Sequence, residues 1–264
     1  MSGAGSATVV MVRAMRTRGW IIPAAAVLAV SFAAGSSAQP SRAVAPPAET
    51  PAEPVVVELF TAQGCAGCLE ANTRIEALAE TPGVIALTYA VDYWDYLGWV
   101  DTFARPEFAQ RQRAYSRPLR IRDVATPQVV IDGRRQVPGA QEEALKAAVE
   151  EEAARRVFPP EIEFREAGDQ VGVGSGRVPA GGAEVVAVVY KPGPQTVEIE
   201  RGDNRGQTVR QINVVRSVRS LGAWTGRPAL YDLPAGLDDD EAVAVLVQAR
   251  TDRRILNGAV LPPR

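Results

Sequence analysis

The sequence predicts an α/β layer with a mixed sheet and flanking helices, followed by a small antiparallel β domain. Between residues 55 and 158, short apolar runs alternate with helical patterns, which is typical of α/β proteins. After Phe158-Pro159-Pro160 the helical patterns end, and short apolar or alternating runs are separated by Gly, Pro and Asp. Such runs are typical of antiparallel β domains. We therefore expect one domain over residues 55–158 and a second, β-rich domain over residues 161–264.

Each expected element of these domains follows from its own stretch of sequence. In the first domain, strands are expected at residues 55–60, 84–91 and 128–132, with a short partner strand near 135–137. Helices are expected at about 65–80, 105–116 and 141–156. In the second domain, the apolar runs cover residues 161–165, 183–190, 197–200, 207–219, 242–249 and 255–260.

The first 54 residues predict export and an extended tether. A basic stretch with three arginines precedes an apolar stretch at residues 20–35, and small residues follow up to position 38. This is the pattern of a signal peptide, which we expect over residues 1–38. An uncleaved membrane anchor is disfavoured, because the apolar stretch is shorter than the roughly 20 residues that span a bilayer. The proline-rich residues 39–54 are expected to form an extended tether.

The expected mature protein is periplasmic or secreted, with no membrane span. Removal of residues 1–38 takes away three arginines and no acidic residue, so the formal net charge changes from −2 to −5. A mildly acidic chain lacks the basic surface that nucleic-acid binding requires. We therefore expect no nucleic-acid partner.

The chain has only two cysteines, Cys65 and Cys68, and they follow the strand expected at residues 55–60. A Cys-x-x-Cys pair at a strand-to-helix junction is typical of thiol–disulfide exchange. The chain has no histidine, and Leu69 follows the second cysteine, so haem attachment through Cys-x-x-Cys-His is excluded. Two thiolates with only oxygen donors are a poor match to zinc or copper sites. We expect no metal and no cofactor, and redox exchange or a structural disulfide remains.

Helix geometry gives the two thiols different surroundings. Cys68, Ala71, Ile75 and Leu78 follow a three-four spacing and should share the face that packs on the sheet. We therefore expect Cys68 to be covered and Cys65, at the first turn, to be the accessible nucleophile. The helix N-terminus favours the thiolate of Cys65 by lowering its pKa below the usual value of about 8.5.

Glu58 is a further candidate catalytic residue. It stands between Val57 and Leu59 in a strand that we expect at the centre of the sheet. A carboxylate buried there, behind the first helix, would be able to relay the proton of Cys68. The alternative is a half-exposed strand glutamate without a chemical role.

A second signal is Pro127, which opens the strand pattern of residues 128–132. A proline at the start of a regular strand indicates a special backbone, and a cis Thr126–Pro127 bond is the option that often marks function. The alternative is a trans proline that ends a loop.

Together these features make the chain similar to the thioredoxin superfamily: a first strand, Cys-x-x-Cys opening a helix, and a later cis proline at the start of a strand. The resemblance implies that Pro127 lies against the disulfide and that the Thr126 backbone pairs with the substrate's chain. More narrowly, the motifs at residues 57–68, 91–99 and 126–128 resemble the secreted bacterial family called domain of unknown function 1223. Two positions depart from that family's usual pattern, Leu69 and Ala90, the latter where members commonly have a histidine.

Half of the chain's 16 aromatic residues lie between Tyr89 and Tyr115. Packing of an insertion onto the core explains most of them. The polar stretch at residues 92–96 follows a strand's C-terminal end, where α/β proteins form ligand sites. Tyr93, Trp94 and Trp99 are therefore candidate substrate-binding residues, together with Thr126.

Two functional hypotheses follow from these residues. In the first, the protein is an exported thiol–disulfide oxidoreductase, in which Cys65 forms a mixed disulfide and Cys68 resolves it. Its partner would be a protein or a small thiol or disulfide in the cell envelope. In the second, the protein is a non-catalytic envelope binding protein on a thioredoxin scaffold, with a structural Cys65–Cys68 disulfide.

Overall fold

The computed structural model of this chain describes residues 53–155 and 158–264, which belong to one compact unit. The expected signal peptide, residues 1–38, and nearly all of the expected tether lie outside the described residues. Strands β1 (Val55–Thr61), β2 (Val84–Ala90), β3 (Gln128–Ile131) and β4 (Arg135–Pro138) confirm the predicted strands of the first region. Helices α1 (Cys68–Ala79), α2 (Pro106–Ala114) and α3 (Glu142–Ala154) confirm its helices, and a short 3-10 helix, η1 (Asp95–Leu97), is added.

The remaining strands lie in the C-terminal part of the chain. They are β5 (Ile162–Phe164), β6 (Gln170–Val173), β7 (Ala183–Glu198), β8 (Thr208–Trp224), β9 (Ala229–Asp232), β10 (Ala242–Ala249) and β11 (Ile255–Leu261). The sequence patterns did not indicate β6 and β9, and they divided β7 into two runs. Both missed strands have four residues, and β6 contains Gly172, a residue depleted in strands.

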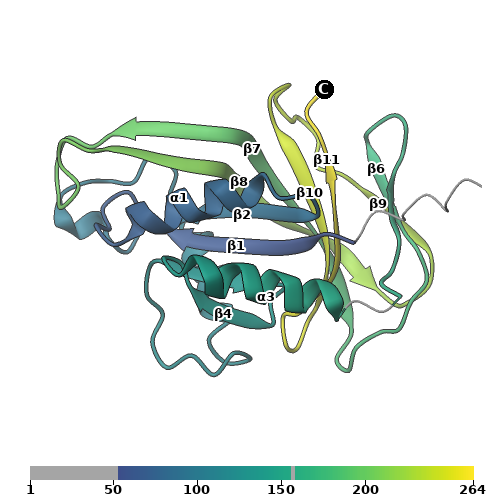
Figure 1. Ribbon diagram of the computed structural model, residues 1–264. Helices are drawn as coiled ribbons and strands as arrows, with labels where there is room; N and C mark the ends of the chain where they lie inside the picture. Colours follow the sequence, from purple (N-terminus) through teal and green to yellow (C-terminus); the bar gives the residue numbers. More distant parts are fainter. Residues whose placement is uncertain (1–52, 156–157) are drawn as a thin grey trace, which may run out of the picture. The chain divides into compact units, whose positions relative to one another are not determined.

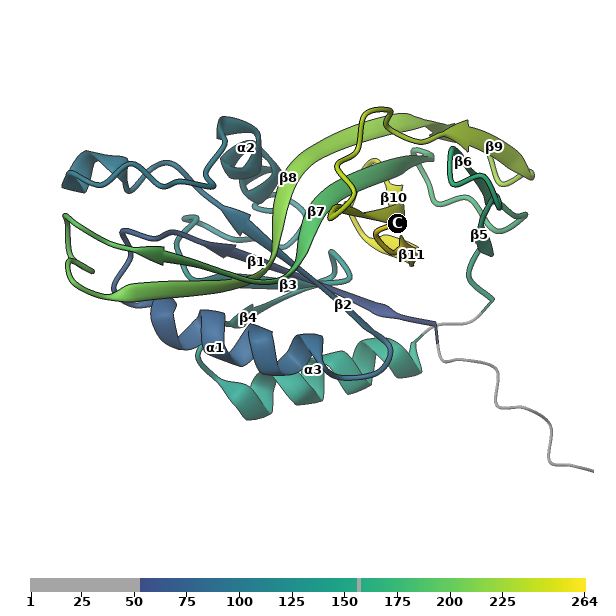
Figure 2. The same ribbon diagram turned by 90° about the horizontal axis from the view of Figure 1, so that it is seen from above.

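The structure is an α/β fold with a large mixed sheet of eight strands and a small antiparallel sheet of three. The large sheet has the order β11-β10-β7-β8-β2-β1-β3-β4, and β5, β6 and β9 form the small one. Strand β1 runs parallel to β2 and antiparallel to β3. Helices α1 and α3 lie together beneath one face of this region, and α2 lies on the opposite side (Figures 1 and 2).

The large sheet continues across the boundary that we predicted between the two regions. Strand β8 pairs with β2 in parallel through Val214 and Thr88. Just before it, the Asn213 side chain donates to the Ala86 carbonyl at 3.0 Å and accepts from the Gly193 amide at 3.0 Å. An asparagine tolerates the left-handed backbone, φ 48°, that this bridge uses. The β7–β8 hairpin is thereby joined to the strands of the first region.

Strands β7 and β8 are long and strongly bent, as Figure 2 shows. Their antiparallel register shifts at three places, including the step between Val189 and Tyr190. Bulges of this kind bend a strand without ending it. One part of the hairpin therefore lies beside β2, and the other pairs with β10.

Strand β1 is the centre of the hydrophobic core, and all seven of its residues are buried. Its side chains alternate between the two faces of the sheet. Val55, Val57 and Leu59 pack in one apolar cluster with residues of α1 and α3, whereas Val56 and Phe60 pack in another with residues of α2 and β10. Glu58 therefore faces α2, away from α1.

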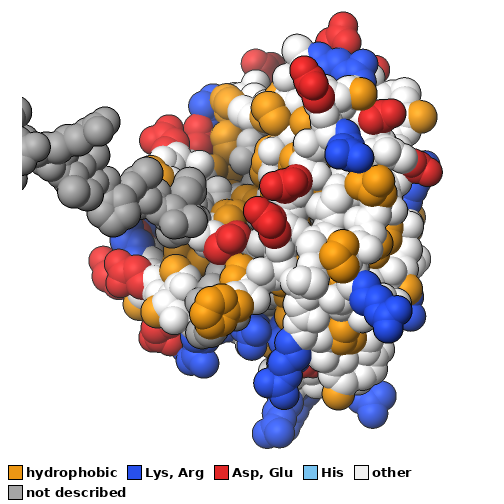
Figure 3. Space-filling view, turned by 90° about the vertical axis from the view of Figure 1, so that its right-hand side faces the viewer, with side chains coloured by type: hydrophobic (Ala, Val, Ile, Leu, Met, Phe, Trp, Pro, Cys, Tyr) orange, Lys and Arg blue, Asp and Glu red, His pale blue; other side chains and the backbone are white. Residues whose placement is uncertain are grey.

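The small sheet lies at one end of the described unit, next to β11 (Figure 1). Figure 3 views this end and shows acidic, basic and apolar side chains interspersed over the surface. Leu230 of β9 is about half exposed there. This end belongs to the C-terminal part of the chain, whereas the two cysteines lie at the N-terminal end of α1.

Candidate functional site

Cys65 and Cys68 form a disulfide, with their Cα atoms 5.4 Å apart. Helix α1 begins at Cys68, three residues later than expected, and Cys65 lies in the preceding turn. The Cys68 amide donates to the Cys65 carbonyl at 3.0 Å, which closes this turn. The expected exposure of Cys65 is not found in this oxidised form, because Cys65 is only 2% exposed and Cys68 is fully buried.

The Thr126–Pro127 peptide bond is cis, as the sequence analysis predicted. Its position beside the disulfide is set by close packing. A Cβ atom on Gly67 would lie 3.9 Å from the Pro127 ring, and one on Gly139 would lie only 2.8 Å from the Ala71 Cβ atom. Gly139 therefore lets α1 approach the loop that holds Pro127.

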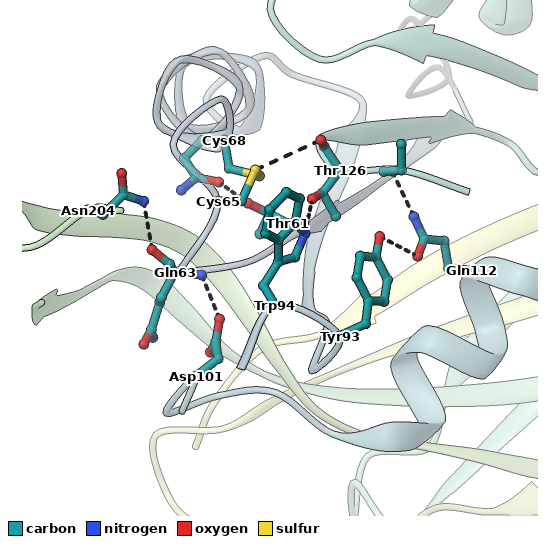
Figure 4. Close-up of a disulfide and its surroundings, with 12 residues drawn as sticks. Thr61, Gln63, Cys65, Cys68, Tyr93, Trp94, Asp101, Gln112, Thr126 and Asn204 are labelled. Carbon is teal, nitrogen blue, oxygen red and sulfur yellow. Dashed lines mark hydrogen bonds between the residues drawn. A yellow bond between two sulfur atoms is a disulfide. The ribbon is translucent and has the colours of Figure 1, made fainter. Parts of the chain in front are cut away.

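The carbonyl oxygen of Thr126 lies 3.8 Å from the Cys65 sulfur (Figure 4). A disulfide sulfur has no proton, so this is a van der Waals contact in the oxidised form. In the reduced form, the Cys65 thiol would have an acceptor within reach. The structure thus brings four predicted site residues together: Cys65, Cys68, Thr126 and Pro127.

The three predicted aromatic residues lie next to this group or to the turn that leads into it, and each is half-buried and hydrogen-bonded within the protein. The Trp94 indole donates to the Thr126 hydroxyl at 2.7 Å. The Tyr93 hydroxyl donates to the Gln112 side chain at 3.1 Å, and the Trp99 indole donates to the Gln63 side chain at 2.9 Å. Burial raises the pKa of Tyr93, so this hydroxyl stays a donor at neutral pH.

Gln63 is a residue to which the sequence analysis assigned no role, and it holds the turn before Cys65 in place. It is fully buried, and its amide donates to the Asp101 carboxylate at 2.6 Å. Its side-chain oxygen also accepts from the Thr102 amide at 3.1 Å, and its carbonyl accepts from the Asn204 side chain at 2.7 Å. A polar residue just before the cysteines was a usable signal for Gln63, but no pattern indicated Asn204.

Asp101 is a buried carboxylate next to this turn, only 5% exposed. Burial raises its pKa from 3.8 to about 6. The amide donors of Gln63 and Phe103 lower the pKa, because they favour the charged form, but they offset only part of the effect of burial. Asp95 adds a smaller upward shift. Asp101 is therefore charged at neutral pH and gains a proton in mildly acidic solution.

We expect this carboxylate to make the protein less stable as the pH rises from about 4 to about 6. In that window the folded state binds the proton and the unfolded state has lost it, so the unfolding free energy falls with rising pH, in total by about 3 kcal/mol. Asp101→Asn should remove this contribution. Urea unfolding at several pH values, with the exposed Asp203→Asn as control, measures the difference. Equal pH dependence in Asp101→Asn and the unmodified protein would contradict the prediction.

Glu58 is buried, as predicted, but its expected position behind α1 is wrong. It lies on the other face of the sheet, where Arg111 of α2 donates to it at 2.6 Å and the Tyr115 hydroxyl also donates to it. Arg111 and Tyr115 in turn contact Gln248 of β10. The alternation of side chains along β1 explains this, because Phe60 and Glu58 share a face, whereas α1 covers the residues between them.

No group of three or more Cys, Asp or Glu side chains that could hold a metal ion is found in the part of the chain that the structure describes. Within residues 53–155 and 158–264, none of the helices has the length and apolar character needed to cross a membrane.

One family model matches most of this chain. Residues 56–248 match the family described as "Protein of unknown function (DUF1223)". No curated protein matches the sequence. An X-ray crystal structure of a protein from Agrobacterium tumefaciens is 31% identical with a TM-score of 0.64, covering 80% of this chain and 94% of that chain. The structure of HBP35 of Porphyromonas gingivalis is 16% identical with a TM-score of 0.56, covering 81% of this chain and 76% of that one, a likeness of fold alone.

The family match covers well over half of the chain, and the bacterial crystal structure matches nearly over its whole length. The matched residues include the disulfide, the cis proline and the aromatic residues around them. This chain therefore belongs to the DUF1223 family of proteins of unknown function.

Proposed function

We propose that this protein is an exported thiol–disulfide oxidoreductase with a thioredoxin-like core. The observation that carries the proposal is the Cys65–Cys68 disulfide packed beside the cis Thr126–Pro127 bond, with the Thr126 carbonyl 3.8 Å from the Cys65 sulfur. The strand order β2-β1-β3-β4, with α1 and α3 on one face and α2 on the other, supports the thioredoxin-like assignment. Export to the periplasm or the exterior, where disulfides persist, follows from the predicted signal peptide.

In the proposed reaction, the reduced protein attacks a client disulfide through the Cys65 thiolate. A bond forms between Cys65 and one client sulfur, the client disulfide breaks, and its electron pair leaves on the second client sulfur as a thiolate. Cys68 then attacks the Cys65 sulfur and releases the client's first sulfur as a thiolate. The client has gained two electrons, and the Cys65–Cys68 disulfide has re-formed. The reverse sequence oxidises a dithiol client.

The neighbouring residues have separate roles in this proposal. Pro127 keeps the loop in contact with the disulfide, and the Thr126 backbone is available to pair with an extended client chain. Tyr93, Trp94 and Trp99 border the approach to Cys65. Glu58 has no direct role in this proposal, because its carboxylate is engaged by the ion pair with Arg111 and by the Tyr115 hydroxyl.

A second candidate, a binding protein with a structural disulfide, is favoured by one observation: both cysteines are buried. Energetics weigh against it. A disulfide stabilises a protein mainly by restricting the conformations of the unfolded chain. For a closed loop of four residues, this adds only about 2 kcal/mol to the free energy of unfolding, the low end of the usual range. A structural staple would be more effective between residues far apart in sequence.

We expect the purified protein, residues 39–264, to accelerate disulfide reduction in a protein client such as insulin in the presence of dithiothreitol. Cys65→Ser should lose this acceleration, since the one remaining thiol, Cys68, is fully buried and is not placed to attack a client disulfide. The double variant Cys65→Ser/Cys68→Ser is the control for uncatalysed reduction. The binding-protein alternative is the better account if the unmodified protein and the double variant give the same rate, in both reduction and oxidative refolding assays.

A further inference from the structure

Trp94 covers the disulfide from the side on which Thr126 lies. Its Cβ atom is 3.6 Å from the position that a Cβ on Gly64 would take, and its side chain packs against the cluster that contains Cys65 and Cys68. Figure 4 shows its indole reaching past the disulfide to the Thr126 hydroxyl, to which it donates at 2.7 Å. Cys65 is only 2% exposed under this cover, so its sulfur presents little surface to a thiol in solution.

Two parts of the surroundings could in principle move to expose the sulfur. The turn before Cys65 is held by four hydrogen bonds of Gln63. Gln63 donates one of them, to Asp101, and accepts the other three, from Trp99, Thr102 and Asn204. The Trp94 side chain has one hydrogen bond, to Thr126, and otherwise packs against Tyr93 and the apolar cluster. Because one hydrogen bond opens far more often than four, access to Cys65 goes through movement of Trp94.

Movement of Trp94 leaves two surfaces without a partner. The Thr126 hydroxyl loses its donor, and the apolar surface around Ala62, Cys65 and Cys68 is left open to water. A partner that supplies a bulky apolar side chain and a backbone N–H replaces both interactions. A small, charged thiol such as glutathione has amide N–H groups but no bulky apolar side chain, so it leaves the apolar surface open to water.

We propose that Trp94 determines the substrate class: it closes the disulfide to small hydrophilic thiols and yields to polypeptide segments with a bulky apolar residue next to their cysteine. This inference rests on the proposed thiol–disulfide exchange and adds the choice of partner. In the step concerned, the partner's thiolate attacks Cys65, a partner–Cys65 disulfide forms, and the Cys65–Cys68 bond breaks with its electron pair on Cys68. A second thiol of the partner then releases Cys65 and completes the two-electron transfer.

The test compares reduction of the oxidised protein by glutathione and by a synthetic peptide with two cysteines flanked by Leu and Phe. Rates are measured by acid quench, alkylation and mass spectrometry at equal thiolate concentration. For the unmodified protein, we expect the peptide to react at least about tenfold faster than glutathione. Trp94→Ala should raise the glutathione rate at least about tenfold and remove most of this preference, since it removes both the cover and the hydrogen bond.

Two milder variants separate the hydrogen bond from the cover. Trp94→Phe keeps a ring but has no donor, and Thr126→Val keeps the shape but has no acceptor, so each should raise the glutathione rate by about two- to tenfold. These two variants carry the test if Trp94→Ala does not fold. Tyr96→Ala is the control, because Tyr96 lies in the same segment, is 79% exposed and should leave both rates unchanged.

The outcomes distinguish the two proposals. If the unmodified protein exchanges with both thiols, but Trp94→Ala, Trp94→Phe and Thr126→Val leave the ratio of the two rates unchanged, the role of Trp94 is refuted and the exchange function stands. If neither thiol reduces the disulfide, even in Trp94→Ala, both proposals are refuted.

Discussion

Cys68→Ser is expected to convert a transient mixed disulfide into a stable one. Once Cys65 has joined a client sulfur, collapse of the intermediate requires attack by the Cys68 thiolate, and serine cannot supply it. Cys68 lies at the first position of α1 and is bonded to Cys65, so no other described residue is placed to take over this step. The captured fraction of the protein should rise at least about tenfold over the unmodified chain.

The measurement is a diagonal gel of envelope extracts from cells that express Cys68→Ser, with reduction between the two dimensions. Cys65→Ser is the matched control, because it keeps one cysteine and has lost the nucleophile. Proteins that leave the diagonal in the Cys68→Ser extract, but not in the Cys65→Ser extract, are clients bound through Cys65 and support the proposed function. A Cys68→Ser protein that is fully monomeric, with a free Cys65 thiol and no adducts, would refute the resolving role assigned to Cys68.

Arg111→Met is expected to destabilise the fold by about 3–5 kcal/mol, because it removes one partner of a buried ion pair and leaves a charge without compensation. Glu58 is fully buried and Arg111 is 7% exposed, with 2.6 Å between the paired atoms. Arg111 also lies over the rings of Tyr89 and Tyr115. Burial raises the pKa of both tyrosines, so they stay neutral, and a tyrosine has no positive charge with which to replace Arg111.

Urea unfolding of the oxidised proteins measures this effect, and Arg113→Met, an exposed position on the same helix, is the control. The double variant Glu58→Leu/Arg111→Met should recover most of the lost stability, since a buried pair can be replaced by apolar residues at little cost. The same variants test the idea that Glu58 relays a proton to Cys68. If Glu58 took part in thiol–disulfide exchange, the double variant would be stable but would exchange more slowly than the unmodified protein. We expect the two exchange rates to be equal.

Most elements whose residues are neighbours in the sequence were predicted correctly, whereas features that depend on residues far apart in the sequence were not. The strands β1 to β4 and helices α1 to α3 follow from runs of apolar residues, and each lies within a few residues of its predicted bounds. Strand β7 was divided because Lys191 to Pro194 interrupts its apolar run, yet the hairpin continues through that stretch with a shift of register. A bulge absorbs the interruption, and a pattern of apolar residues does not reveal it.

By itself, the sequence determined the Cys65–Cys68 motif, the special backbone at Pro127 and the aromatic residues that border them, because all three are expressed in short stretches of neighbouring residues. Tertiary structure decided the rest. Which face of β1 meets α1, and hence that Glu58 pairs with Arg111, depends on how the helices cross the sheet. The bond from Asn204 to Gln63 joins residues 141 positions apart. Contacts of this kind form between backbone and side-chain groups that come together only when the whole chain has folded, so no local pattern of residue types predicts them.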